Sequence, residues 1–169
     1  MKKLLSLTLC LLMLCAATIA HAEEPVNARD VITEYTALDL TVYEGKAIYI
    51  NFLTEWCPYC MLELPDIKTL YETYDPDDLA IVLVHVWDGE DETNTQSIIE
   101  EYGLEEMTFY EDMDRSLAAF VGLQGYPASL FIDKDGVLNG AYNYYLSYEQ
   151  MQAEMEAMGV DLRPEDADV

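Results

Sequence analysis

Basic residues are scarce in this chain of 169 residues, which has 8 lysines and arginines against 33 aspartates and glutamates. The resulting net charge of −25 at pH 7 makes a surface that repels phosphate backbones and anionic lipid headgroups. Nucleic acid and anionic lipid are therefore excluded as main partners. A solvated acidic surface keeps a protein in solution, and we expect a monomer.

The first 22 residues are not typical of a folded domain. Lys2 and Lys3 precede an apolar run over residues 4–20, and Ala20-His21-Ala22 offers small residues at the two positions that a signal peptidase reads. We predict a secretory signal over residues 1–22, which makes the mature protein extracytoplasmic, either secreted or periplasmic. An uncleaved membrane anchor is the alternative, although the run is close to the shortest length for a span. Cleavage after Ala22 removes two bases and no acid, and leaves a net charge of −27.

Cysteine is also scarce, and cleavage makes it scarcer, because Cys10 and Cys15 leave with the signal. Only Cys57 and Cys60 remain. Exported proteins commonly use disulfides as structural cross-links, but a bridge between cysteines three positions apart closes too small a loop to restrain the unfolded chain much. Reactivity explains this pair better than stabilisation does.

The position of the pair supports that interpretation. An apolar run, Ala47 to Leu53, precedes it and is typical of a buried strand, and an apolar-periodic helix opens directly after it at Met61. At a helix start, free backbone N–H groups and the positive end of the helix dipole favour a thiolate. This lowers the pKa of Cys57 and makes it the candidate nucleophile. Cys60, within the first turn, can close a disulfide with it and release a bound partner.

The remaining sequence predicts an α/β domain with a central mixed sheet flanked by helices. We predict a linker over residues 23–34, the domain over residues 35–159 and a disordered tail over residues 160–169. The predicted strands span residues 47–53, 79–87, 107–110, 128–132 and 137–144, with an outer strand or hairpin over 35–43. The predicted helices span residues 57–74, 95–102, 115–121 and 147–158.

With these residues in place, the chain resembles the thioredoxin-like fold, and in particular the extracytoplasmic TlpA/ResA-type thiol-disulfide oxidoreductases. The resemblance is carried by Asn51 to Cys60, Glu63-Leu64-Pro65, Gly125 to Asp133, and Lys134-Asp135-Gly136. These segments are similar to the family's strand with its active-site motif, its acidic residue and helix-kinking proline, its cis-proline loop with the next strand, and its hairpin turn. A lone Cys-x-x-Cys is weak evidence, but this combination is specific.

The resemblance implies dithiol–disulfide exchange with exported protein substrates, and it implies no cofactor and no metal. Cys57 and Cys60 become the catalytic pair and form the redox disulfide. Pro127, in a cis peptide bond, would lie against Cys57. The backbone of Tyr126 would pair with an extended substrate chain as a short added strand.

Other candidate site residues lie close to the pair in the sequence. Trp56, Pro58 and Tyr59 would form a rim that contacts the substrate, although plain packing equally explains Trp56. Glu55 and Glu63 are candidates for tuning the pKa of the thiols. An exposed acid at a strand end is the alternative for Glu55.

Some residues depart from related families. Asn51 stands where cytoplasmic thioredoxins have a buried aspartate, which leaves the proton acceptor for Cys60 open, and TlpA-type proteins share the asparagine. Tyr126 is bulkier than the threonine common in relatives, and the Pro58-Tyr59 dipeptide resembles glutaredoxins. The family implies a reductase that receives electrons from a membrane thiol transporter and serves cytochrome c maturation or exported proteins in general. The sequence leaves the direction of electron flow open.

Two other classes of function use the same residues. A metal chaperone would hold Cu(I) or Zn with Cys57, Cys60 and His85, but one Cys-x-x-Cys supplies half of a structural zinc site. His85 also lies in an apolar strand pattern that is typical of a core residue. A peroxidase is indicated by the spacing from Thr54 to Cys57, which is that of peroxiredoxins, but Ile50 stands where that family needs a proline.

Overall fold

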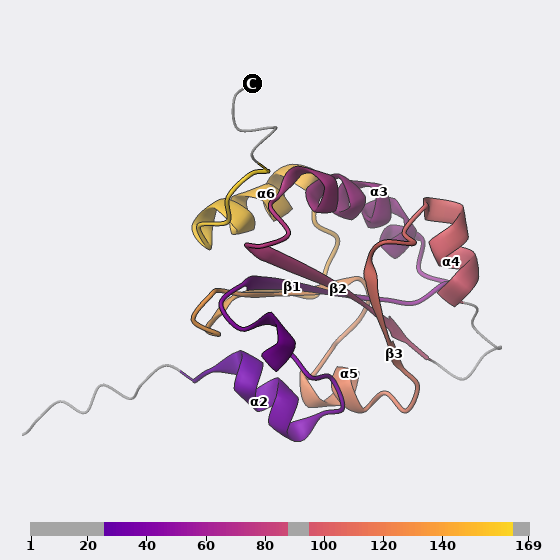
Figure 1. Ribbon diagram of the computed structural model, residues 1–169. Helices are drawn as coiled ribbons and strands as arrows, with labels where there is room; N and C mark the ends of the chain where they lie inside the picture. Colours follow the sequence, from indigo (N-terminus) through magenta and orange to yellow (C-terminus); the bar gives the residue numbers. More distant parts are fainter. Residues whose placement is uncertain (1–25, 88–94, 164–169) are drawn as a thin grey trace, which may run out of the picture.

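The structure is a computed structural model that describes residues 26–87 and 95–163 (Figure 1). The predicted signal over residues 1–22 lies outside these ranges. Across the described ranges, none of the helices has the length and apolar character needed to cross a membrane.

A sheet of five strands forms the middle layer of the described residues. Its strands lie in the order β3-β2-β1-β4-β5, in which β1 pairs in parallel with β2 and β2 with β3, whereas β4 is antiparallel to β1 and to β5. The strands are β1 (Ala47–Leu53), β2 (Leu79–Val86), β3 (Thr108–Asp112), β4 (Ala128–Ile132) and β5 (Leu138–Tyr142). The predicted mixed sheet is therefore confirmed.

Helices cover both faces of the sheet (Figure 1). One face carries α3 (Pro58–Thr73), α4 (Thr95–Tyr102) and α6 (Tyr148–Ala157), and the other carries α2 (Ala28–Tyr35) and α5 (Ser116–Phe120). A 3₁₀ turn, η1, spans Thr41–Tyr43. Helices on both faces bury the inner strands β1, β2 and β4 along their whole length, which is why these strands have continuous apolar sequences.

The central strand β1 shows how the two faces divide its side chains. All seven of its residues are buried. Tyr49 and Leu53 pack into the core beneath α3 and α6, while Ile48 and Phe52 pack into the core on the side of α2 and α5. This alternation follows from the two-residue period of a strand. It fixes the course of β1, so that the following cysteines come directly after the carboxyl end of the central strand of the sheet.

The prediction of a linker over residues 23–34 is wrong for residues 28–34, because α2 begins at Ala28 and is part of the folded unit. Residues 23–25 lie outside the described residues. The side chain of Asn27 caps the helix by accepting a hydrogen bond from the backbone of Asp30. Arg29 is buried and donates to the backbone carbonyls of Lys46, Asp133 and Lys134. The polar composition of this segment suggests a solvated linker. In the fold, the charged group of Arg29 is hydrogen-bonded instead to backbone carbonyl groups from elsewhere in the chain.

Two further predictions need correction. Residues 35–43 form no strand; they contain the end of α2, a loop and η1, and Leu38 and Leu40 of this segment are buried. The predicted disordered tail begins too early, because Val160 is buried and Leu162 forms a β-bridge with Tyr74. The rest of that tail, residues 164–169, lies outside the described residues.

Candidate active site

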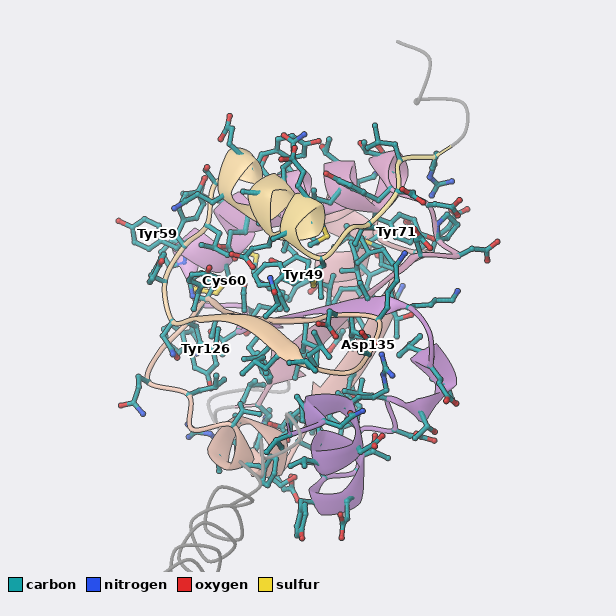
Figure 2. All side chains as sticks on the ribbon, turned by 90° about the vertical axis from the view of Figure 1, so that its left-hand side faces the viewer. Tyr49, Tyr59, Cys60, Tyr71, Tyr126 and Asp135 are labelled. Carbon is teal, nitrogen blue, oxygen red and sulfur yellow. A yellow bond between two sulfur atoms is a disulfide. The ribbon has the colours of Figure 1, made fainter. Side chains whose placement is uncertain are left out.

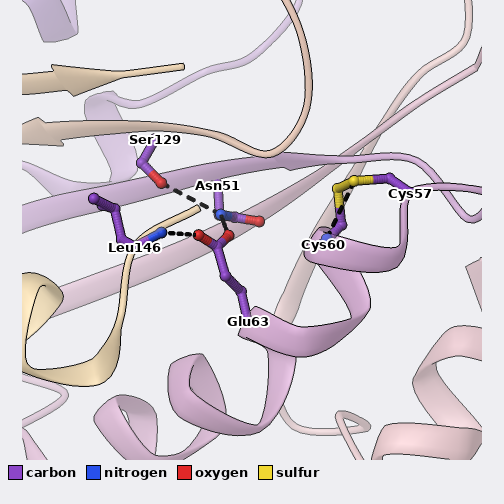
Figure 3. Close-up of a disulfide and its surroundings, with 6 residues drawn as sticks. All are labelled: Asn51, Cys57, Cys60, Glu63, Ser129 and Leu146. Atoms are coloured by element: carbon purple, nitrogen blue, oxygen red, sulfur yellow. Dashed lines mark hydrogen bonds between the residues drawn. A yellow bond between two sulfur atoms is a disulfide. The ribbon is translucent and has the colours of Figure 1, made fainter. Parts of the chain in front are cut away.

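A disulfide joins Cys57 and Cys60 at the start of α3 (Figure 3). Its S–S distance is 2.12 Å and its Cα atoms are 5.2 Å apart. Cys57 is the N-cap of α3 and Pro58 is its first residue, a position where proline starts a helix well because its fixed φ is helical and its missing N–H has no partner to lose. The predicted pairing of these cysteines is confirmed, as is their place between β1 and a helix.

The sulfur of Cys57 accepts a hydrogen bond of 3.1 Å from the backbone N–H of Cys60. In this position a side chain satisfies one of the donors that every helix start leaves without a partner in the helix. The same donor and the helix dipole would stabilise a negative charge on that sulfur. The sulfur of Cys57 thus has a backbone donor at the start of α3.

Exposed side chains surround the two nearly covered sulfurs. Cys57 and Cys60 expose 3% and 1% of their surface, whereas Trp56 and Tyr59 expose 58% and 60%. Pro58 is also exposed. The cysteines are therefore nearly covered themselves, but their neighbours in the chain are open to solvent.

The loop that leads into β4 lies beside the pair. The peptide bond between Tyr126 and Pro127 is cis. Because β4 is antiparallel to β1, with Ala128 opposite Phe52, the start of β4 lies at the end of β1 from which the chain continues to the cysteines. The ring of Tyr126 meets that of Trp56 edge-on, with 6.0 Å between the ring centres. Figure 2 shows Tyr126, Cys60 and Tyr59 along the same side of the molecule.

Glu63 forms a buried network beside the pair (Figure 3). Its carboxylate is fully buried, accepts a hydrogen bond of 3.0 Å from the side-chain amide of Asn51, and accepts another from the backbone N–H of Leu146. The same amide nitrogen of Asn51 lies 3.3 Å from the hydroxyls of Tyr49 and Ser129. Burial raises the pKa of Glu63 to about 7, against the opposing effect of the hydrogen bonds from Leu146 and Asn51. This carboxyl group therefore changes its protonation state near neutral pH.

Glu55 differs from Glu63 in its surroundings. It is exposed in the short connection between β1 and α3. Of the two carboxyl groups that the sequence offers for tuning the thiols, the structure places only Glu63 inside the protein, on the same helix as Cys60.

The segment between β5 and α6 also borders the site, although no sequence motif predicted it. Leu146 of this segment is held against α3 by Glu63, and the adjacent ring of Tyr145 lies 6.3 Å from that of Tyr59. Tyr144 and Tyr145 are both exposed. The signal that could have found them is the group of three tyrosines at positions 142, 144 and 145, shortly before the capping box of α6.

His85 does not complete a metal site with the cysteines. It is buried in β2, and its Nδ1 lies 2.7 Å from the hydroxyl of Thr95. Within residues 26–87 and 95–163, no group of three or more histidine, cysteine, aspartate or glutamate side chains is gathered closely enough to hold a metal ion.

On this fold, a disulfide that starts a helix and faces a cis-proline loop is the arrangement of the thioredoxin-like thiol-disulfide oxidoreductases, and that is the class of this protein. Its sequence agrees: the chain belongs to the AhpC/TSA family, whose profile matches residues 26–141. Curated relatives include the thiol-disulfide oxidoreductase ResA of Geobacillus thermodenitrificans, which is 29% identical over 119 residues that span 70% of this chain and 67% of ResA.

Two further matches extend the comparison. An uncharacterized protein of Haemophilus influenzae is 31% identical over 155 residues, which cover 90% of this chain and 97% of that protein. Among solved structures, a secreted disulfide oxidoreductase of Mycobacterium tuberculosis is similar in fold, with a TM-score of 0.61 and 24% identity over 71% of this chain and 87% of that one.

Proposed function

We propose that this protein is exported and acts as a reductase that exchanges the Cys57–Cys60 couple with disulfides of other exported proteins. The Cys57 thiolate attacks one sulfur of a substrate disulfide, and the other substrate sulfur leaves with the electron pair. Cys60, as thiolate, then attacks Cys57, and the substrate leaves as a dithiol while Cys57–Cys60 becomes the disulfide. Two electrons pass from the protein to its substrate.

The observation that carries this proposal is the hydrogen bond from the backbone of Cys60 to the sulfur of Cys57 at the helix start. Hydrogen bonds to an ionised acceptor are about twice as strong as neutral ones. The bond therefore favours the thiolate of Cys57 over its thiol, which lowers the pKa of this group once the disulfide is open.

Glu63 is our candidate for the group that accepts the proton of the Cys60 thiol and returns it. Its carboxyl is buried, lies on the helix that carries Cys60 in its first turn, and has its pKa raised to about 7 by burial. A group with such a pKa accepts and returns protons at neutral pH. Glu55 is the weaker candidate, because a solvent-exposed carboxylate is screened by water.

The substrate would approach over the exposed rim of Trp56, Pro58 and Tyr59 and lie along the loop of Tyr126 and Pro127. The aromatic rings offer apolar contact area around the sulfurs. The predicted signal over residues 1–22 supports export. The family resemblance implies a membrane thiol transporter as the electron source. Substrates of cytochrome c maturation, or exported proteins in general, are the expected partners.

Reduction of insulin disulfides by dithiothreitol as electron donor tests the proposal. We expect the wild-type protein to accelerate the reaction and Cys57→Ser to abolish it. The matched variant Cys60→Ser should form a mixed disulfide with insulin through Cys57 and stop there, which mass spectrometry detects. Residual turnover by Cys57→Ser would refute its role as nucleophile.

The reduction potential of the couple, measured by equilibration with glutathione, tests the direction. A value near that of thioredoxin, about −270 mV, supports a reductase, whereas a value near about −120 mV indicates an oxidase.

A further inference from the structure

A cavity of about 250 Å³ opens beside the cis-proline loop. This volume is below the roughly 300–1,000 Å³ of small-molecule sites, so the cavity suits one side chain of a larger partner. Its floor is formed by α5 and its wall by the loop that precedes Pro127. Its lining includes Arg115, Ala118, Leu123, Gln124, Gly125 and Tyr126.

Tyr126 connects this cavity to the disulfide. Its side chain packs against the core that contains Cys57 and Cys60 and also against the core on the α5 side. Its ring contacts Trp56 as described above. A polypeptide that lies along residues 125–127 to bring a sulfur to Cys57 therefore lies against two residues that line the cavity, Gly125 and Tyr126.

The walls of the cavity are held in place by hydrogen bonds. The backbone N–H of Gln124 donates to the side chain of Asn143 at 3.0 Å. The buried carboxylate of Asp112 accepts from the backbones of Leu117 and Ala118 at 3.1 and 2.8 Å, which fixes the start of α5. A site with such fixed walls loses little ordering entropy when a side chain enters it.

Arg115 is the one charged residue that lines the cavity. It is exposed, and its backbone has φ 61°, a left-handed conformation that is uncommon for arginine. Among the described residues, no carboxylate lies within ion-pairing distance of its guanidinium; the ion pairs found there are Lys46–Asp77 and Lys134–Asp78. An arginine fork matches a carboxylate group better than a lysine does.

We propose that this cavity is a specificity subsite for a glutamate or aspartate within three residues of the reactive cysteine of the substrate. Ala118 and Leu123 take up the apolar stem of that side chain, and Arg115 binds its carboxylate. An extended chain advances about 3.3 Å per residue, so three residues span about 10 Å. This inference rests on the proposed function and names a determinant of its substrate class.

Short peptides with one cysteine, linked as a mixed disulfide to 2-nitro-5-thiobenzoate, test the proposal. The Cys57 thiolate of the reduced protein attacks the cysteine sulfur of the peptide, and coloured nitrothiobenzoate leaves with the electron pair. Cys60 then attacks Cys57 and releases the peptide as a thiol. The rate of colour release is measured for peptides with Glu, Gln or Lys at each of the three positions on either side of the cysteine.

We expect one position at which Glu reacts about fivefold faster than Gln, as one ion pair at a protein surface allows, and at which Lys reacts more slowly. The preference should shrink in 1 M salt, because salt screens exposed charges. Arg115→Gln should remove the preference and Arg115→Glu should turn it toward Lys. Lys68→Glu is the matched control: it makes the same charge change on α3, on the other face of the sheet, and should keep the preference for Glu.

Equal rates for the three peptides at every position, with colour release that still depends on Cys57, would overturn the subsite and leave the proposed function standing. An equal effect of Lys68→Glu and Arg115→Glu would also overturn it, because long-range charge would then explain the preference. Colour release that does not depend on Cys57 would overturn the subsite together with the proposed function. If Arg115→Glu fails to fold, Arg115→Gln and the salt dependence of the wild type decide the question.

Discussion

The side-chain amide of Asn51 on β1 donates a hydrogen bond of 3.0 Å to the carboxylate of Glu63 on α3. Cytoplasmic thioredoxins, by the resemblance described above, have an acidic residue where this chain has Asn51. Here the buried carboxyl group comes from the helix instead, and the strand supplies its hydrogen-bond donor. The interior beside the cysteines therefore contains an ionisable carboxyl group, as in those thioredoxins, but here it belongs to the helix instead of the strand.

Replacing Glu63 by glutamine should change how stability depends on pH. Because burial raises the pKa of Glu63 from 4.5 to about 7, the folded protein between these values holds a proton that the unfolded chain has released. Stability contributed by this group is present at low pH and is lost as pH rises toward 7, by on the order of 3 kcal/mol. Urea unfolding at pH 5 and pH 8 should show this loss in the wild type and a smaller one in Glu63→Gln.

The control for that measurement is Glu72→Gln, which changes an exposed carboxyl on the same helix. It should follow the wild-type pH dependence. Parallel behaviour of wild type and Glu63→Gln would mean that Glu63 does not titrate in this range.

Removing the hydroxyl of Tyr49 should destabilise the fold although it leaves the ring in place. This buried hydroxyl lies 3.3 Å from both the hydroxyl of Ser129 and the amide nitrogen of Asn51, and donates to the sulfur of Met151 at 3.2 Å. Tyr49→Phe leaves polar groups with one partner fewer, at a cost of about 1–2 kcal/mol in the free energy of unfolding. Tyr35→Phe, at a side chain that is 64% exposed, should stay within about 0.5 kcal/mol of the wild type.

Arg29 should prove essential for stability although it lies in a segment with the composition of a linker. Its guanidinium donates to the carbonyls of Lys46, Asp133 and Lys134 at 3.1–3.2 Å. Arg29→Met removes all of these donors from a buried position, and we expect a loss of about 2–4 kcal/mol in the free energy of unfolding, measured with urea. Lys68→Met, which removes a cation without such contacts, is the control; equal losses would contradict this role.

Truncation of the exposed rings next to the disulfide should weaken turnover and spare the fold. Trp56 and Tyr59 are 58% and 60% exposed, so Trp56→Ala and Tyr59→Ala should each alter the unfolding free energy by less than Tyr49→Phe does. Since large aromatic side chains often dominate contacts with a partner, kcat/KM for insulin reduction should fall about tenfold. Val42→Ala, at a side chain that is 67% exposed, should leave both quantities unchanged. Unaltered turnover by both ring variants would exclude this rim from substrate contact.

Features whose causes are local in the chain could be predicted from the sequence. The apolar runs of β1 and β2 signal strands buried on both faces, and the capping box of Ser147 and Gln150 marks the start of α6. The location of the cysteine pair could also be predicted, since the sequence indicates a strand before it and a helix after it. The class of the protein and the position of its sulfurs follow from such local signals.

Features that depend on distant partners could not be predicted in this way. The hydrogen bond from Leu146 to Glu63 joins residues 83 positions apart, and neither residue has a local pattern that indicates it. The sequence of α2 predicts a linker because the carbonyl groups that accept hydrogen bonds from Arg29 belong to other segments. Val160 is likewise part of the folded core because it packs beside α3 and α6, and the residues next to it in the sequence do not indicate this. Composition alone does not reveal partners of this kind.

The hairpin turn at Gly136 reverses the chain and also contacts the start of α2. Gly136 has φ 83°, its carbonyl accepts a 2.7 Å hydrogen bond from the backbone of Ala28, and a methyl group on its α-carbon would meet the side chain of Asn27 at 2.4 Å. Helix α2 can thus lie close against the turn because residue 136 has no side chain. We expect α2 and the turn to open and close together as one cooperative unit in hydrogen exchange. A substitution at Gly136 should therefore lower the protection of α2 as well.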